Sequence, residues 1–280
     1  MLAPFYAWIP SLAPPAPFWQ GKRCLLTGAS SGLGEALAHE LTKRGATLVL
    51  CARRAERLEA VARACGGGSK VLPMDVAAGD TVVEAKASEA LELLGGRCDV
   101  LLCAAGVGQR TDAAATSAAD HRAIMAANFE GPVALTRVLL PPMLARGAGS
   151  IAVVTSVQGR FGQPFRSSYA ASKAAAIGYF DSLRAEVASR GLGVTVVSPG
   201  YIATDHASSA LGGDGAADAN ANAGMPPAEL AALIADAVAE GRAELVAAPL
   251  DARAAIVLRA LWPAAVFKLM ERKAAKPKGA

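Results

Sequence analysis

Short apolar runs alternate with longer amphipathic segments along most of this chain, and few folds can bury both. Strands are predicted at residues 23–27, 47–51, 70–74, 100–103, 150–155 and 193–198, with a short seventh at 244–247. Helices are predicted at residues 34–44, 54–65, 79–94, 119–146, 168–189 and 227–240. Continuously apolar strands separated by helices are typical of strands buried on both faces of a sheet. The pattern therefore predicts an α/β fold with a doubly wound parallel sheet, of the Rossmann type.

A single domain accounts for most of the chain. The 280 residues are 53% hydrophobic and 19% charged, as a packed domain requires, and a chain of about 300 residues can share one core. We expect the Rossmann domain at residues 21–250, after an irregular, apolar, proline-rich arm at 1–20 and before a C-terminal helix and basic tail at 251–280. Residues 201–224 are rich in small side chains and lack periodicity, so they are predicted to form a loop.

Charge and cysteine usage exclude several classes of protein. Residues 268–278 hold five basic side chains and one acidic one, which accounts for the formal net charge of +4 and leaves the rest neutral. No basic stripe interleaved with aromatic residues is present, so we do not expect nucleic-acid binding. The five cysteines are scattered without CxxC spacing, and the three histidines are dispersed. These patterns predict neither a disulfide framework nor a metal site, and they fit an intracellular, reducing compartment.

A glycine-rich turn follows the first predicted strand directly and opens a helix. Its glycines allow a tight turn, a close approach of backbone N–H groups to a pyrophosphate, and close packing of helix on strand. The helix N-terminus also favours an anion. The turn therefore predicts a dinucleotide site with these candidate residues: Thr27, Gly28, Ser30, Ser31, Gly32, Leu33 and Gly34.

The end of the second predicted strand indicates which dinucleotide binds. NAD-binding proteins usually place an acidic residue there, whereas this chain has Arg53 and Arg54. An arginine can donate two charge-assisted hydrogen bonds to a 2′-phosphate, which favours NADP(H) over NAD. We expect Arg53 to make this contact, with Arg54 and Ser30 or Ser31 as helpers. The alternative is that both arginines only face solvent at the start of the next helix.

Tyr169 and Lys173 lie four residues apart on a predicted helix and therefore share one face. A nearby ammonium favours the ionised form of a phenol, so we expect Lys173 to lower the pKa of Tyr169. Ser156 ends a predicted strand, at the carboxyl edge where open α/β sheets bind ligands. Three polar side chains are thus predicted to converge at one place.

These motifs resemble those of the short-chain dehydrogenase/reductase family over residues 21–250. The resemblance implies that Ser156 hydrogen-bonds the substrate oxygen, that Tyr169 exchanges the proton and that Lys173 holds the nicotinamide ribose. It also implies that Asn128 holds a relay water. Further cofactor contacts are implied at Asp75, Pro199, Gly200 and Thr204.

The chain departs from this family after the fourth predicted strand. Where the family usually has two asparagines, this sequence has Cys103 and Ala104. The second asparagine ties the central sheet together through its side-chain amide, which Ala104 cannot do. The departure predicts a loss of stability and leaves the candidate catalytic residues untouched.

The combined features predict an NADP(H)-dependent oxidoreductase that reduces the carbonyl of a hydrophobic, lipid-like substrate. Segments 156–160, 164–173 and 258–263 resemble a membrane-associated branch of the family linked to reduction of acyl- or alkyl-dihydroxyacetone phosphate. Two alternatives stay open: an NAD(P)-dependent retinol- or steroid-type alcohol dehydrogenase, and a catalytically idle NADP(H)-binding sensor or scaffold.

The sequence leaves open what the two ends of the chain contact. The apolar N-terminal arm can lie on a membrane surface or cover apolar protein surface. The apolar stretch at residues 256–270, with basic residues behind it, can contact a membrane, the domain itself or a second subunit of a homo-oligomer. Peripheral association with the endoplasmic reticulum or peroxisomal membrane is therefore one expectation.

Overall fold

The computed structural model describes residues 18–204, 210–212 and 224–275. Seven parallel strands form one sheet in the order β3-β2-β1-β4-β5-β6-β7. The strands are β1 (Arg23–Thr27), β2 (Thr47–Ala52), β3 (Lys70–Pro73), β4 (Val100–Cys103), β5 (Gly149–Val154), β6 (Leu192–Val197) and β7 (Glu244–Leu245). The predicted doubly wound Rossmann sheet is confirmed, and each predicted strand lies within about two residues of the observed one.

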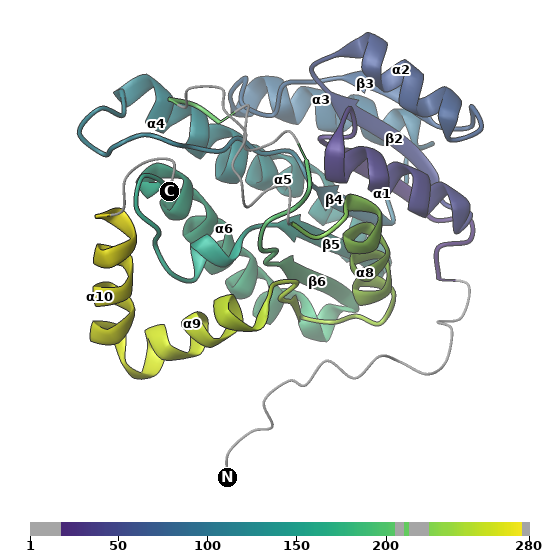
Figure 1. Cartoon of the computed structure of the whole chain (residues 1–280). Coiled ribbons are helices and arrows are strands. Elements are labelled where there is room, and N and C mark those ends of the chain that lie inside the picture. Colours follow the sequence, from purple (N-terminus) through teal and green to yellow (C-terminus); the bar gives the residue numbers. More distant parts are fainter. Residues whose placement is uncertain (1–17, 205–209, 213–223, 276–280) are drawn as a thin grey trace.

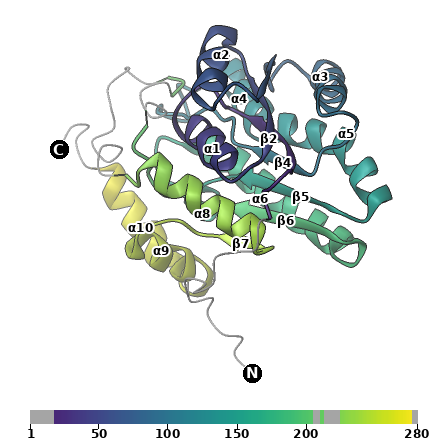
Figure 2. The same ribbon diagram turned by 90° about the vertical axis from the view of Figure 1, so that its right-hand side faces the viewer.

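Helices cover both faces of the sheet (Figure 1). The principal helices are α1 (Gly32–Lys43), α2 (Ala55–Ala64), α3 (Asp80–Leu93), α4 (Ala118–Met125), α5 (Gly131–Arg146), α6 (Ser167–Val187) and α8 (Pro227–Ala239). Figure 2 shows α1 and α8 on one side of the sheet and α3 and α5 on the other. Alternate residues of β1 enter different cores, since Leu26 packs with α1 and α8 while Leu25 packs with α3, α5 and α6.

The chain reverses its direction of travel across the sheet between β1 and β4. Strands β2 and β3 extend from β1 towards one edge, and β4 to β7 extend towards the other. In such sheets ligands bind outside the carboxyl ends of the strands at this switch point. The turn after β1 and the segments after β4 and β5 therefore meet at one edge, where the candidate site lies.

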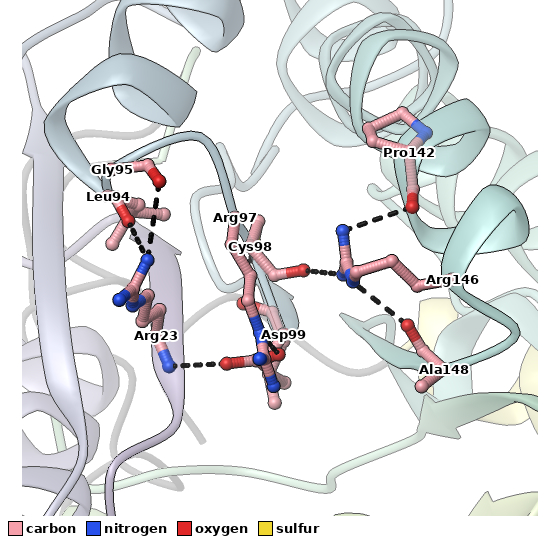
Figure 3. A network of polar contacts seen from close by, with 10 residues as sticks. Arg23, Leu94, Gly95, Arg97, Cys98, Asp99, Pro142, Arg146 and Ala148 are labelled. Carbon is pink, nitrogen blue, oxygen red and sulfur yellow. Dashed lines mark hydrogen bonds and ion pairs between the residues drawn. The ribbon is translucent and has the colours of Figure 1, made fainter.

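A polar network closes the opposite, amino-terminal edge of the sheet (Figure 3). Asp99 is 7% exposed and accepts from Arg23 N at 3.0 Å and from Arg97 Nε at 2.7 Å. Arg23 Nη1 donates to Leu94 O at 3.0 Å, and Arg146 Nη2 donates to Cys98 O at 2.6 Å. The network joins β1, the α3–β4 connection and the end of α5, far from the candidate site.

The predicted helix at 119–146 is interrupted. Residues Ala126–Glu130 form a single π-helical turn between α4 and α5. The whole stretch Ala118–Arg146 is long and apolar enough to cross a membrane, by length and composition only, and half of its most apolar window is buried inside the protein. Because it packs against α3 and α6, we interpret it as a core helix.

The two ends of the chain differ from the predicted boundaries. Trp19, which the sequence analysis placed in the N-terminal arm, is 2% exposed and donates from Nε1 to Ala235 O at 3.1 Å. The prediction of a single C-terminal helix is wrong, because two helices, α9 (Leu250–Leu261) and α10 (Pro263–Ala274), meet at an angle there. Pro263 cannot continue α9 and disfavours a helical conformation at Trp262, whose φ is −143° and ψ 71°, which explains the break. Residues 1–17, 276–280 and most of the predicted loop at 201–224 lie outside the described residues.

Candidate active site

Tyr169 and Lys173 project from the first turns of α6 towards the carboxyl end of β5. The side chains of Ser156 and Tyr169 are hydrogen-bonded to each other. Lys173 Nζ lies 5.7 Å from the centre of the Tyr169 ring and donates to Val154 O at 2.9 Å. Ser156 Oγ also accepts from Gln158 N at 3.1 Å, which fixes its position after β5. The structure thus brings the three predicted side chains together.

Burial dominates the protonation of this group. It raises the pKa of Tyr169, which the hydrogen bond with Ser156 and the charge of Arg166 lower only in part. It also lowers the pKa of Lys173 to about 8, although Cys103 opposes this shift. The expected lowering of the Tyr169 pKa by Lys173 is therefore wrong for this structure, because burial disfavours both charged side chains. A phenol that keeps its proton suits a proton donor.

Asn128 lies in the π-helical turn between α4 and α5 and is 1% exposed. Its Oδ1 accepts from Val107 N at 2.8 Å, and its Nδ2 donates to Val107 O at 2.9 Å and to Ser172 Oγ at 3.0 Å. Ser172 Oγ donates in turn to Tyr169 O at 2.8 Å. Asn128 therefore links the segment after β4 to the helix that carries Tyr169, and its role towards a relay water stays a prediction.

The glycine turn forms a cradle that side chains would fill. A Cβ atom on Gly28, whose φ is +72°, would stand 2.7 Å from Ala105 N. On Gly34 it would stand 2.1 Å from Gly28 O, and on Gly32 it would stand 3.0 Å from Thr204 Cγ2. The bare backbone at the start of α1 fits a pyrophosphate, whose oxygens need close N–H groups and no intervening side chain.

Comparison with known proteins decides the family. The family model of the short chain dehydrogenases matches residues 22–212. The chain belongs to the short-chain dehydrogenase/reductase family. Dehydrogenase/reductase SDR family member 7B of Danio rerio is 41% identical over 271 residues, which cover 93% of this chain and 88% of that protein.

Two solved structures from the same family resemble the fold closely. A short-chain dehydrogenase from Streptomyces avermitilis has a TM-score of 0.76 and 29% identity, covering 92% of this chain and 98% of its own. A metagenomic short-chain oxidoreductase in complex with NADP has a TM-score of 0.69 and 28% identity, covering 83% of this chain and 98% of its own. This chain is thus an oxidoreductase of the short-chain dehydrogenase/reductase family by fold and sequence.

The two arginines after β2 differ in their contacts. Arg54 Nη2 donates to Ser30 Oγ and to Ser31 Oγ, both at 3.1 Å, and so joins α2 to the glycine turn. Arg53, which the sequence analysis favoured, is exposed at the end of β2. Arg54 is exposed as well, and which of the two arginines meets a 2′-phosphate stays a prediction.

Thr27 connects β1 to the segment after β4, where the family asparagines are missing. Its Oγ1 accepts from Ala104 N at 3.2 Å and from Ala105 N at 3.3 Å, so β1 and the segment after β4 remain tied. The effect of Ala104 on stability stays a prediction.

The remaining predicted cofactor residues lie along the same edge. Thr204 adjoins the glycine turn through Gly32. Pro199 O accepts from Val157 N at 3.0 Å, and Gly200 N donates to Ala247 O at 2.9 Å. Asp75 is exposed just beyond β3, where its Oδ1 accepts from Ala77 N at 3.0 Å.

The sequence analysis missed two residues beside Tyr169. His121 Nδ1 lies 3.0 Å from Ser168 Oγ, and Gln109 Oε1 accepts from the backbone N–H groups of Ser168 and Tyr169. Both come from the connection between β4 and α5, about 50 residues before α6, and neither belongs to a motif. Only the packing of this connection against the start of α6 reveals them.

The five cysteines are interior residues. All are free and buried. Burial raises the pKa of Cys98 and of Cys103 to about 12, so both thiols stay protonated at neutral pH.

Proposed function

We propose that this protein is an NADP(H)-dependent reductase of hydrophobic, lipid-like carbonyl compounds. The observation that carries the proposal is the hydrogen-bonded pair Ser156–Tyr169, with Lys173 beside it, at the carboxyl edge of the sheet next to the glycine turn. Bound NADPH supplies the hydride. The chain's own residues interact with the carbonyl oxygen, which gains negative charge as the hydride is transferred.

Two hydroxyl groups act on that oxygen. Ser156 donates a hydrogen bond to it, and Tyr169 gives it a proton. Because these interactions strengthen as charge develops, they stabilise the transition state more than the ground state. The raised pKa of Tyr169 keeps the proton available at neutral pH. Lys173 donates a hydrogen bond to Val154 O. In this position its ammonium can offset the negative charge that forms on the phenol as the phenol loses its proton.

The preference for NADP(H) is supported by Arg54. Its guanidinium already contacts Ser30 and Ser31 in the cradle, and it presents a charge that a 2′-phosphate can use. The metagenomic relative whose structure holds NADP supports the same cofactor.

The hydrophobic substrate class is supported by an apolar hollow of about 430 Å³ beside the catalytic segment. It lies between α10 and the segment that joins Ser156 to Tyr169. Its lining residues are Phe161, Gly162, Pro164, Arg259, Val266, Phe267, Met270, Glu271 and Ala274. Because none of the four candidate catalytic residues lines it, the proposal assigns to it only a part of the substrate remote from the reacting carbonyl.

Oxidation of NADPH with a panel of lipid carbonyls tests the proposal. The panel should contain long-chain aldehydes, ketosteroids, retinal and an acyl-dihydroxyacetone phosphate, with NADH measured in parallel. Turnover of a lipid carbonyl with NADPH is expected. Tight NADPH binding without any turnover would instead support the idle sensor, and faster alcohol oxidation with NAD would support the retinol- or steroid-type dehydrogenase.

We also propose that α9 and α10 rest on an anionic membrane surface. With the exception of Val82, the exposed large hydrophobic side chains of the described residues all lie on these two helices or between them. They are Leu250, Val257, Leu258, Leu261, Trp262, Phe267 and Leu269. The same helices carry five basic side chains against two acidic ones, which favours anionic lipid over neutral protein surface.

Co-sedimentation with vesicles tests this contact. We expect binding to phosphatidylcholine vesicles that contain phosphatidylserine, weaker binding without it, and loss of binding in Leu261→Ser/Trp262→Ser. The contrary result is a wild-type protein that binds neither kind of vesicle but forms a dimer, and whose dimer is lost in the same double variant. That result would assign the surface to a second copy of the chain.

A further inference from the structure

Gln109 lies between β4 and α4, and its side chain is fully buried, at 0% exposure. Its Oε1 accepts from Ser168 N at 2.8 Å and from Tyr169 N at 3.2 Å. These N–H groups belong to the first turn of α6, where an α-helix leaves its amides without partners of its own. Arg166, at the N-cap position of α6, makes no capping hydrogen bond with its side chain. Gln109 thus caps the helix that carries Tyr169 from a distant part of the chain.

The amide of Gln109 is held in one orientation. Its Nε2 donates to Thr116 Oγ1 at 2.7 Å, and Thr116 Oγ1 donates to Asp112 O at 2.9 Å. Two backbone N–H donors can be met only by the oxygen of the amide, so the assignment of Oε1 and Nε2 follows from the contacts. The oxygen that faces α6 cannot turn away without breaking both sets of hydrogen bonds.

The backbone around Gln109 contacts a third element. Gln109 pairs with Leu211 in a parallel bridge. Arg110 N donates to Leu211 O at 3.1 Å, and Leu211 N donates to Gly108 O at 3.0 Å. Leu211 follows β6 and lies seven residues after Thr204, the residue that adjoins the glycine turn. Gln109 therefore touches the start of α6 through its side chain and the segment after β6 through its backbone.

We propose that Gln109 is the positioning residue for Tyr169: it fixes the first turn of α6 so that the phenol stays on Ser156, and it links this turn to the segment at Leu211. The inference rests on the proposed function for the role of Tyr169. The inference can be tested separately from that function, because the hydrogen bonds of Gln109 to the two backbone amides can be measured without substrate.

Two substitutions of equal length separate positioning from mere packing. Gln109→Met removes the acceptor, and Gln109→Glu keeps an oxygen towards both N–H groups while it adds a negative charge. For Gln109→Met we expect kcat to fall about tenfold, which corresponds to ~1.4 kcal/mol, while KM for NADPH stays unchanged. For Gln109→Glu we expect most of kcat to return. Gln20→Met, at an exposed glutamine beyond the opposite edge of the sheet, should leave kcat unchanged.

The pH profile provides a readout that packing alone would not move. The charge of Gln109→Glu disfavours the phenolate, so the alkaline limb of kcat should shift to higher pH. The other charged or titratable groups around this turn are Arg166 just before α6, Lys173 on α6, His121 on α4, and Arg110 and Asp112 on the segment of Gln109, and all are unchanged in both variants.

Hydrogen exchange makes the outcomes distinct. We expect the amides of Ser168 and Tyr169 to lose protection in Gln109→Met and to keep it in Gln109→Glu. Unchanged exchange in Gln109→Met, or lost protection with kcat and the pH profile unaltered, would overturn the inference. If Gln109→Met does not fold, a Gln109→Glu variant that keeps the protection of both amides but loses kcat overturns it instead. A wild-type protein without turnover would refute the proposed function, while exchange still reports whether Gln109 holds α6.

Discussion

Lys173 Nζ lies 5.7 Å from the ring centre of Tyr169, one helical turn further along α6, and donates to Val154 O at 2.9 Å. The carbonyl at the end of β5 thereby fixes the ammonium beside the phenol. Because the spacing within α6 and the strand end both follow from the sequence, this relationship could be predicted. The pKa values could not, since they depend on burial.

Replacing Tyr169 by Phe removes the proposed proton donor and keeps the ring. We expect kcat for carbonyl reduction to fall about 10²- to 10⁴-fold, the usual contribution of a general acid. NADPH affinity, measured by fluorescence titration, should change little. Tyr179→Phe on the same helix is the control, because its ring packs against Phe129 and Phe180 away from the site. Turnover of Tyr169→Phe near that of the wild type would assign the proton transfer to another group.

Much of the fold and part of the site could be predicted from the sequence. Local periodicity determines the strands, and the glycine turn determines how α1 begins. The contact of Arg54 with Ser30 and Ser31 could not be predicted, since it depends on side-chain direction. The same holds for Gln109 and for the π-helical turn at Asn128, which arise from packing between segments distant in the chain.

The cofactor preference should depend on Arg54 more than on Arg53. Arg54→Ala removes a guanidinium that lies within hydrogen-bonding distance of Ser30 and Ser31. We expect the Kd for NADPH to rise about 10- to 100-fold, as hydrogen bonds to charged groups contribute ~1.5–3 kcal/mol, and the Kd for NADH to change little. Arg57→Ala makes the same charge change on the exposed side of α2 and serves as the control. Equal losses for both nucleotides would show that Arg54 does not recognise the 2′-phosphate.

Lys173 should make stability depend on alkaline pH. Burial lowers its pKa from 10.5 to about 8 in the folded protein. Between these two values the unfolded chain binds the proton more strongly, so the free energy of unfolding should rise with pH from about 8 to 10.5. Lys173→Met should lack this rise, and urea titrations of both proteins across this range measure it. If the free energy of unfolding depended on pH in the same way in both proteins, the lowered pKa of the buried Lys173 would be contradicted.

Asp99 should make stability depend on acid pH. Burial raises its pKa, but the hydrogen bonds from Arg23 N and Arg97 more than offset this and hold the pKa below its ordinary value. Its contribution is therefore present above about pH 4 and is lost as pH falls through the lowered pKa. Asp99→Asn should lower the free energy of unfolding by about 1–3 kcal/mol at pH 7, with the difference shrinking in acid.

The control for Asp99 is an exposed ion pair. Asp181 pairs with Arg184 at 2.8 Å, with the carboxylate side chain 43% exposed. Asp181→Asn should change the free energy of unfolding by about 0.5 kcal/mol or less. If the two substitutions had equal effects in thermal melts at pH 7, the burial of Asp99 would add nothing to the stability of the protein.

The same substitution at two helical glycines should have opposite effects. In Gly34→Ala the added methyl group would stand 2.1 Å from Gly28 O, so the turn must move away from α1. We expect a loss of about 2–3 kcal/mol in the free energy of unfolding and weaker dinucleotide binding, because the cradle changes shape.

Gly178 is exposed within α6, and an added methyl group there would meet nothing within 4 Å. Gly178→Ala should therefore stabilise the protein by about 0.5–1 kcal/mol through helix propensity. Urea titrations and NADPH binding of both variants test the pair, and a stable Gly34→Ala with intact binding would mean that the close approach of α1 to β1 is not required.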